Sequence, residues 1–207
     1  MEKIDFVISW VDSSDLEWQR KRQKYDSDKV IASSNGEERF RDYGTLKYLL
    51  RSIDKYADWV HKIYLVTDNQ KPKWLNTMYE KLVIIDHKEI LPSNVLPTFN
   101  SSAIELELDK IPNLSENFVY FNDDFLINKK VTPRDFFING VPRDSRIYSR
   151  FIPFENFNYI NMNDNKCINN LLNRKLVSLK GFFSIHYGLK GNFKKCFSII
   201  CRTWINI

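Results

Sequence analysis

Residues 3–12 read KIDFVISWVD, and the fold class can be argued from this segment outward. Lys3 to Trp10 is rich in β-branched and aromatic residues, which predicts a buried strand, and the carboxylate of Asp12 follows directly after it. Similar apolar segments occur at 61–67 (HKIYLVT), 82–85 (LVII) and 117–121 (NFVYF). Each of them also runs into polar residues, which are Asp68, Asp86 with His87, and Asn122 with Asp123 and Asp124.

Helical patterns lie between the predicted strands. Apolar residues at three- and four-residue spacing predict a helix over 43–57, and Pro72 is placed to begin a short second one. Ser101 or Ser102 can cap a third helix that runs to about Ile111, with Glu105 at the spacing of a capping box. Strands that alternate with helices predict an α/β fold, a mainly parallel sheet flanked by helices with right-handed crossovers.

Length and composition fit one catalytic domain of ordinary size. The chain has 207 residues, 43% of them hydrophobic and 28% charged, with only 6 Gly and 7 Pro, so collagen-like and low-complexity chains are excluded. No apolar run is long enough for a transmembrane helix, and the first residues do not form a signal peptide. The odd count of 3 Cys suits a reducing compartment, so we expect a cytoplasmic protein.

The charge is distributed unevenly along the chain. All 26 acidic residues precede position 175, whereas the segment 175–207 carries only cations, interleaved with aromatic and aliphatic residues. This composition is typical of a basic amphipathic helical tail. Such a tail can contact the inner face of an anionic membrane, or it can pack on the domain, and the two alternatives stay open. Nucleic acid is the weaker interpretation, and no nucleic-acid partner is expected.

The adjacent carboxylates Asp123 and Asp124 are the most informative polar pair. Two carboxylates after an apolar strand repel each other unless a hard cation neutralises them, and Mg²⁺ or Mn²⁺ binds carboxylate oxygens together with substrate phosphates. A tight turn in which Asn122 and Asp123 cap backbone amides explains the same residues equally well. The sequence contains no glycine-rich phosphate loop, HExxH, GxSxG or zinc-type spacing, which excludes common kinase, protease and hydrolase classes.

Other candidates carry less weight individually. Arg39 and Arg41 can hold phosphate oxygens, or they can form surface ion pairs. Glu105 is either a capping carboxylate or a general base. His61 and His87 are candidate acids or bases, although a single histidine is more often structural.

Taken together, the motifs resemble the Stealth family of sugar-phosphate transferases, which includes bacterial capsular polysaccharide phosphotransferases and the catalytic subunit of animal N-acetylglucosamine-1-phosphotransferase. IDFVISWVDSSDLEW (Ile4 to Trp18) is similar to the first conserved block of that family. RFRDYGTLKYLLRSIDKYADWVHKIYLVTDNQKPKWLN (Arg39 to Asn76) and LPTFNSSAIELELDKIPNLSENFVYFNDDFLI (Leu96 to Ile127) are similar to the second.

The resemblance implies a nucleotide-sugar-binding fold akin to glycosyltransferase-A domains. It also implies transfer of a sugar 1-phosphate from a UDP-sugar to a hydroxyl of a polysaccharide or oligosaccharide, in capsular or exopolysaccharide synthesis. The residues carried over as catalytic are Asp124, Glu105 and Asp123, of which Asp123 and Asp124 also bind the metal. Those carried over to the donor pocket are Trp10, Asp12, Arg41, Asp42, Asn100 and Ser101.

The chain also departs from the family pattern. The third and fourth blocks, which carry a His near a Pro and an Arg-Asp or Arg-Asn element, are not recognised before Ile207, and His186 lacks the expected context. We therefore expect a truncated product with a catalytic core at 1–137, a loop-rich covering segment at 138–174 and the basic tail at 175–207. Two alternatives stay open: a glycosyltransferase on the same fold that releases UDP, and a non-catalytic donor-binding fragment.

Overall fold

The computed structural model describes residues 3–25, 40 and 42–143, together with 159, 162–164, 166, 167 and 170. The chain divides into two compact units, Met1–Arg143 and Asp144–Ile207. In the second unit all the described residues are helical. The elements discussed below belong to the first unit, and the predicted tail at 175–207 lies outside the described residues.

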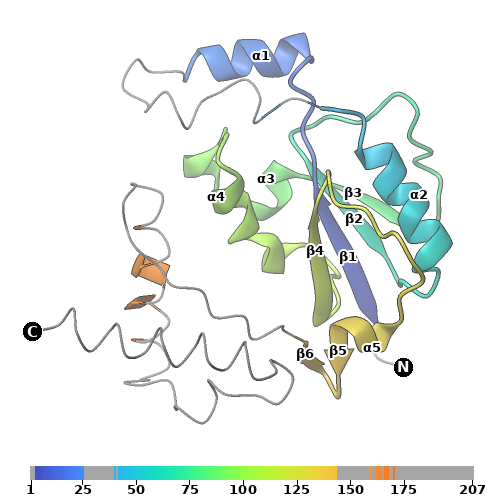
Figure 1. The fold of residues 1–207 in the computed structure, drawn as a ribbon. Helices are drawn as coiled ribbons and strands as arrows, with labels where there is room; N and C mark the ends of the chain where they lie inside the picture. Colours follow the sequence, from blue (N-terminus) through green and yellow to red (C-terminus); the bar gives the residue numbers. More distant parts are fainter. Residues whose placement is uncertain are drawn as a thin grey trace, which may run out of the picture. The chain divides into compact units, whose positions relative to one another are not determined.

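A four-stranded parallel sheet forms the centre of the first unit (Figure 1). Its strands are β1 (Ile4–Ser9), β2 (Ile63–Thr67), β3 (Leu82–Asp86) and β4 (Asn117–Asn122), arranged in the order β3-β2-β1-β4. All three pairings are parallel, so the four carboxyl ends lie at one edge. The predicted strands and the predicted α/β class are therefore confirmed.

Each face of the sheet is covered by helices, because alternate side chains of every strand point to opposite sides. The helix α2 (Leu46–Tyr56) packs on the side chains of Phe6 and Ile8, as the spacing over 43–57 predicted. The short helices α3 (His87–Ile90) and α4 (Ser101–Glu105) cover the opposite face, where Val7 and Val66 are buried (Figure 1). The sheet thus has a separate apolar core on each of its two faces.

Several local predictions were wrong. The segment that begins at Pro72 forms turns rather than a helix. The third predicted helix ends at Glu105 instead of Ile111, and its cap is Asn100, whose side chain accepts a hydrogen bond from the Ser102 N–H. The 3₁₀ helix η4 (Leu108–Lys110) continues the segment.

The remaining elements are short. The helix α1 (Leu16–Gln23) begins at Asp15, whose carboxylate caps two backbone amides. The other elements, in chain order, are the 3₁₀ helix η3 (Ser93–Val95), α5 (Pro133–Phe136), β5 (Phe137–Ile138) and β6 (Val141–Pro142). Among the described helices none has the length and apolar character needed to cross a membrane.

Candidate active site at the carboxyl edge of the sheet

The candidate site lies at the edge where β1 and β4 end side by side. Ser9 is paired with Asn122 at the last position of this parallel ladder. The chain leaves β1 towards β2 on one side, while β4 joins β1 from the other side, so the strand order reverses between them. In open α/β sheets the crevice at such a reversal is the usual place for a ligand.

A hydrogen-bond network centred on Tyr120 connects β1, β4 and α4. The phenolic oxygen of Tyr120 lies 2.7 Å from Ser9 Oγ, 3.1 Å from Asn122 Oδ1 and 3.3 Å from Glu105 Oε1. A phenol has one proton, so Tyr120 donates to either Asn122 or Glu105, while Ser9 donates to the phenolic oxygen. Burial, with a further contribution from the Glu105 carboxylate, raises the pKa of Tyr120 to about 12, so the phenol stays protonated. When it donates to Glu105, Tyr120 orients the carboxylate of this predicted catalytic base.

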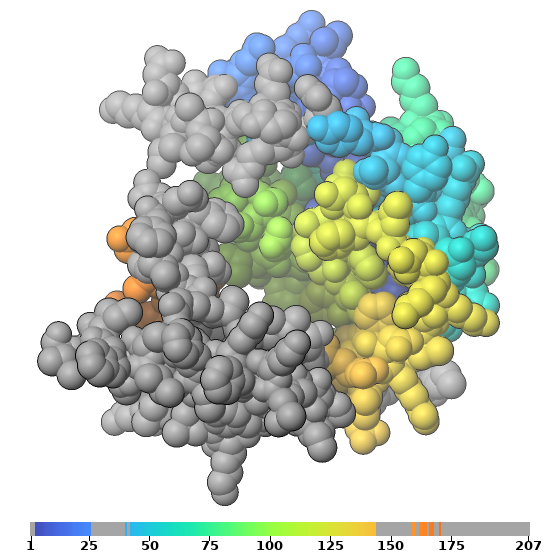
Figure 2. Space-filling view, in the orientation of Figure 1, coloured from blue at the N-terminus to red at the C-terminus, as the bar shows by residue number. Residues whose placement is uncertain are grey.

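A second group of carboxylates surrounds Asp123. Burial, together with the negative charges of Asp124 and Asp42, raises the pKa of Asp123 from 3.8 to about 6. Asp42 is positioned by its own turn, in which its Oδ1 accepts a 2.7 Å hydrogen bond from the N–H of Gly44. Gly44 has φ of 70°, a conformation that favours glycine. Figure 2 shows the residues after β4 (yellow) beside the segment that leads into α2 (cyan), in agreement with this electrostatic coupling.

These carboxylates suit a divalent cation only in part. Among the described residues no group of three His, Cys, Asp or Glu side chains converges to hold a metal ion. Mg²⁺, however, is commonly held by one or two carboxylates together with substrate phosphates. Burial and the neighbouring charges of Asp124 and Asp42 both disfavour the ionised form of Asp123, and a bound cation would offset both effects. Asp123 and Asp124 therefore fit a cation that arrives with a diphosphate.

The predicted donor residues on the β1 side have different environments. The carboxylate of Asp12 accepts hydrogen bonds from the N–H and the hydroxyl of Ser14, at 2.8 and 2.6 Å. The side-chain amide of Gln70 forms reciprocal bonds with the backbone of Asp12, at 3.0 and 2.9 Å, so the loops after β1 and β2 are joined. Trp10 is only 5% exposed and packs in the core on the α2 face, where its indole Nε1–H has no acceptor.

The other predicted donor residues lie around α4 and before α2. Asn100 and Ser101 are exposed at the start of α4, with the Asn100 side chain occupied as the helix cap. Arg41, like Arg39, lies outside the described residues. Of the predicted carboxylates, Asp123 is thus coupled to Asp124 and Asp42, and Glu105 contacts Tyr120, whereas Asp12 contacts Ser14 and Gln70. The two predicted arginines lie outside the described residues.

The ends of β2 and β3 form a separate polar cluster. Lys21 of α1 contacts both carboxylate oxygens of Asp68, at 2.8 and 2.7 Å, and Asp68 is buried. Burial lowers the pKa of the neighbouring His87, which favours its neutral imidazole. His61 lies at the opposite end of the sheet, where its Nδ1 is 2.8 Å from the buried carboxylate of Asp5. This contact indicates that His61 has a structural role.

Sequence reasoning missed Ser9, Tyr120, Gln70 and Lys21 as members of the site. For Ser9 and Tyr120 a signal was present, because both are polar residues on the inward positions of otherwise apolar strands that face α4. Because β1 and β4 are neighbours and these two side chains share one face, their contact could then have been expected. Lys21 and Gln70 carry no comparable signal, since their hydrogen-bond partners depend on how α1 and the loops after β1 and β2 pack together.

Comparison with known proteins identifies the family of the chain. Stealth protein conserved region 2 matches residues 39–144, and Stealth protein conserved region 1 matches residues 2–30. The chain is 47% identical over 205 residues to the exopolysaccharide phosphotransferase cps2G of Lactiplantibacillus plantarum, covering 97% of this chain and 59% of that protein. It is 40% identical over 193 residues to the capsular polysaccharide phosphotransferase WcwK of Streptococcus pneumoniae, covering 91% of this chain and 58% of that protein.

A shorter relative is matched over more of its length. The capsular polysaccharide phosphotransferase eps5J of Streptococcus thermophilus is 41% identical over 190 residues, covering 89% of this chain and 80% of that protein. Against cps2G and WcwK, by contrast, the chain spans a little under three fifths of the relative. The two conserved regions and these identities together show that the chain belongs to the Stealth family.

Proposed function

We propose that this chain takes part in capsular or exopolysaccharide synthesis as a phosphotransferase, which moves a sugar 1-phosphate from a UDP-sugar to a sugar hydroxyl. The observation that carries the proposal is the arrangement of Asp123, Asp124 and Glu105 at the strand-order reversal, in a member of a family whose relatives are named polysaccharide phosphotransferases. The diphosphate is expected at Asp123 and Asp124, and the acceptor hydroxyl at Glu105.

In the proposed reaction the acceptor oxygen attacks the phosphorus next to the donor sugar. A new P–O bond forms to the acceptor, the P–O bond to UMP breaks, and the products are a phosphodiester and UMP. The Glu105 carboxylate takes the proton of the acceptor hydroxyl, and Tyr120 holds that carboxylate in place. A bound Mg²⁺ or Mn²⁺, held by Asp123 and Asp124, would supply positive charge to the diphosphate.

Donor binding is the first test. UDP-N-acetylglucosamine with Mn²⁺ should raise the melting temperature, because a ligand that binds only the folded state stabilises it. The rise should require Mn²⁺ and should be absent in Asp124→Asn. Failure of all UDP-sugars to stabilise a folded wild-type protein would contradict the proposed donor.

Product identity is the second test. Incubation with a UDP-sugar and an oligosaccharide acceptor should release UMP. Release of UDP without UMP would identify a glycosyltransferase, in which the anomeric carbon is attacked. Donor binding without either product would identify a non-catalytic donor-binding chain.

Membrane contact through the basic segment 175–207, which lies outside the described residues, is a separate part of the proposal. It is motivated by the cations and apolar residues of that segment. Sedimentation with phosphatidylglycerol vesicles at low salt, and release at high salt, is the expected result. Equal sedimentation with neutral phosphatidylcholine vesicles would contradict it.

A further inference from the structure

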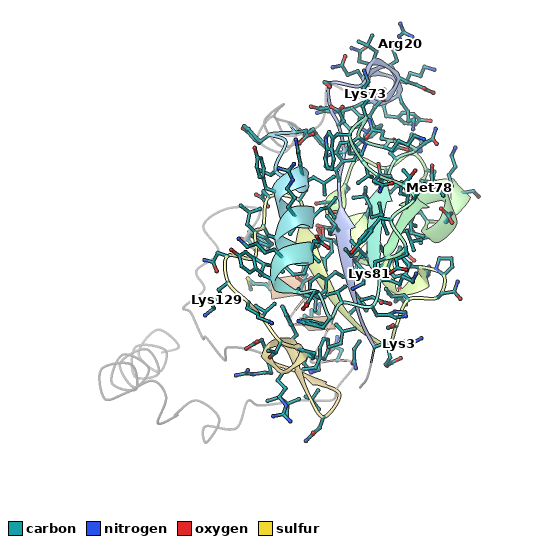
Figure 3. All side chains as sticks on the ribbon, turned by 90° about the vertical axis from the view of Figure 1, so that its right-hand side faces the viewer. Lys3, Arg20, Lys73, Met78, Lys81 and Lys129 are labelled. Atoms are coloured by element: carbon teal, nitrogen blue, oxygen red, sulfur yellow. The ribbon has the colours of Figure 1, made fainter. Side chains whose placement is uncertain are left out.

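A cavity of about 490 Å³ opens on the α2 side of the first unit, away from the carboxylates of the candidate site. It lies between α2 and residues 74–79, which connect β2 to β3; Figure 3 faces this side of the molecule, where Lys73 and Met78 are labelled. Its floor is apolar and belongs to the core, being formed by Leu50, Ile63, Leu75 and Leu82. A volume of this size is within the range of small-molecule sites.

The wall opposite α2 is held by local hydrogen bonds. Leu75 N–H donates to the carbonyl of Pro72 at 3.0 Å, and the side chain of Asn76 accepts from the N–H of Met78 at 3.0 Å. At one end the two walls are joined, because the Tyr79 hydroxyl donates to Asp54 Oδ1 at 3.1 Å. The cavity is therefore a groove closed at the Asp54 end and bounded by ordered walls.

The open end of the groove is cationic. Lys47 and Arg51 lie one turn apart on α2, on the same helical face as Asp54, and both line the cavity. Neither forms an ion pair with any residue that the structure describes. Two adjacent cations that have no ion-pair partner among the described residues can bind an anion from solution.

The opposite wall presents an aromatic surface. Trp74 lines the groove and is 45% exposed, so part of its side chain is accessible to a ligand. An indole ring offers a flat apolar face on which the C–H face of a pyranose can pack, while Asn76 and Asp54 offer polar groups to hydroxyls. An aromatic face with two cations thus matches a ligand that is both a saccharide and an anion.

We propose that this groove binds a phosphate-bearing segment of the saccharide chain, with a sugar ring on Trp74 and its phosphate at Lys47 and Arg51. This inference rests on the proposed function, because the product of that reaction is a saccharide with anionic phosphodiesters. Its location is consistent with such a role: Lys47 is in the first turn of α2, which follows Asp42, the residue that is coupled to Asp123. The lining of the groove therefore starts close in sequence to the candidate site.

Calorimetric titration with phosphorylated dextrins, and with the same dextrins after phosphatase treatment, tests the proposal. The phosphorylated dextrins should bind at least about tenfold more tightly, and their affinity should fall with added salt. Lys47→Glu and Trp74→Ala should each weaken binding about fivefold to tenfold. The matched control is Lys88→Glu, the same charge reversal at an exposed position of α3 on the other face of the sheet, which should bind as the wild type does. If Lys47→Glu melts at a lower temperature than the wild type, Arg51→Glu takes its place as the charge variant of the groove.

Three results would overturn the inference: equal affinity for the two dextrin preparations, equal weakening by Lys88→Glu, or unchanged affinity in both groove charge variants. UDP-sugar binding and UMP release are measured on the same proteins. UMP release without dextrin binding contradicts the groove but leaves the proposed function standing. Dextrin binding that depends on Lys47 and Trp74, without UMP release, supports the groove and contradicts the proposed function.

Discussion

Replacing Asp123 by Asn should stabilise the protein at about pH 7.5 and leave its stability nearly unchanged at about pH 4. Burial, with the carboxylates of Asp124 and Asp42, raises the pKa of Asp123 from 3.8 to about 6, so ionising this group in the folded state costs free energy. A group with a raised folded-state pKa contributes most at low pH, and this contribution is lost as the pH rises through the folded-state pKa. The amide of Asn does not ionise, so the variant should be free of this loss.

The magnitude follows from the two pKa values. A change from 3.8 to about 6 sets an upper bound of about 3 kcal/mol. Because the carboxylate is partly exposed, solvent screening lowers the expected gain to roughly 1–2 kcal/mol. For a chain of 207 residues this corresponds to a rise of roughly 3–6 °C in Tm, measurable by scanning calorimetry across the pH range.

A matched control separates this effect from a general loss of negative charge. Asp109→Asn removes an exposed carboxylate on η4, outside the cluster, and should leave Tm within about 1 °C at both pH values. If Asp123→Asn were no more stable than the wild type at about pH 7.5, or if its gain were the same at about pH 4, the raised pKa of Asp123 would be refuted. The variant should also lose the Mn²⁺-dependent response to UDP-sugars.

Three further substitutions test other parts of the structure. Tyr120→Phe removes the hydroxyl that contacts Glu105, the proposed catalytic base, and should lower kcat for UMP release by about 10- to 100-fold with a smaller change in KM; an unchanged kcat would exclude the positioning role. Ser52→Ala deprives the buried N–H of Ile127 of its 3.1 Å acceptor and should cost about 1–3 kcal/mol in urea unfolding, whereas a neutral result would mean that another acceptor replaces it. Lys21→Met leaves Asp68 without its 2.7 Å partner and should raise the pKa of His87, which Lys21 lowers, in an NMR titration; an unchanged or lower pKa would contradict this coupling.

The fold was largely predictable because its signals are local. Each strand shows its apolar composition over five or six residues, and the polar residues that follow show where it ends. The same alternation explains why Trp10 belongs to the core: it is in phase with Ile4, Phe6 and Ile8, all of which face α2. Short elements were harder, since α3 has only 4 residues and depends on the capping of Asp86.

The sequence predicts where carboxylates follow the strands, but it does not predict their contacts. Asp123 and Asp124 come directly after β4, as the strand pattern predicted. By contrast, the contact between Lys21 and Asp68 joins residues 47 positions apart, and it depends on how α1 packs after Asp15 caps it. Such contacts are set by tertiary packing, which a single sequence does not display.

The position of β4 in the sheet determines when the site can exist. The strands β1, β2 and β3 come from the first 86 residues and are neighbours in the order β3-β2-β1-β4. The contact between Ser9 and Tyr120 spans 111 positions, so it cannot form until β4 has been synthesised and has closed the open edge of β1. During translation a nascent chain therefore presents an unpaired β1 edge for several seconds, at a rate of about 5–20 residues per second. The edge formed by β1 and β4 is complete only at the end of this interval, so any stabilisation by a ligand bound there is a late event in the folding of the chain rather than a guide to it.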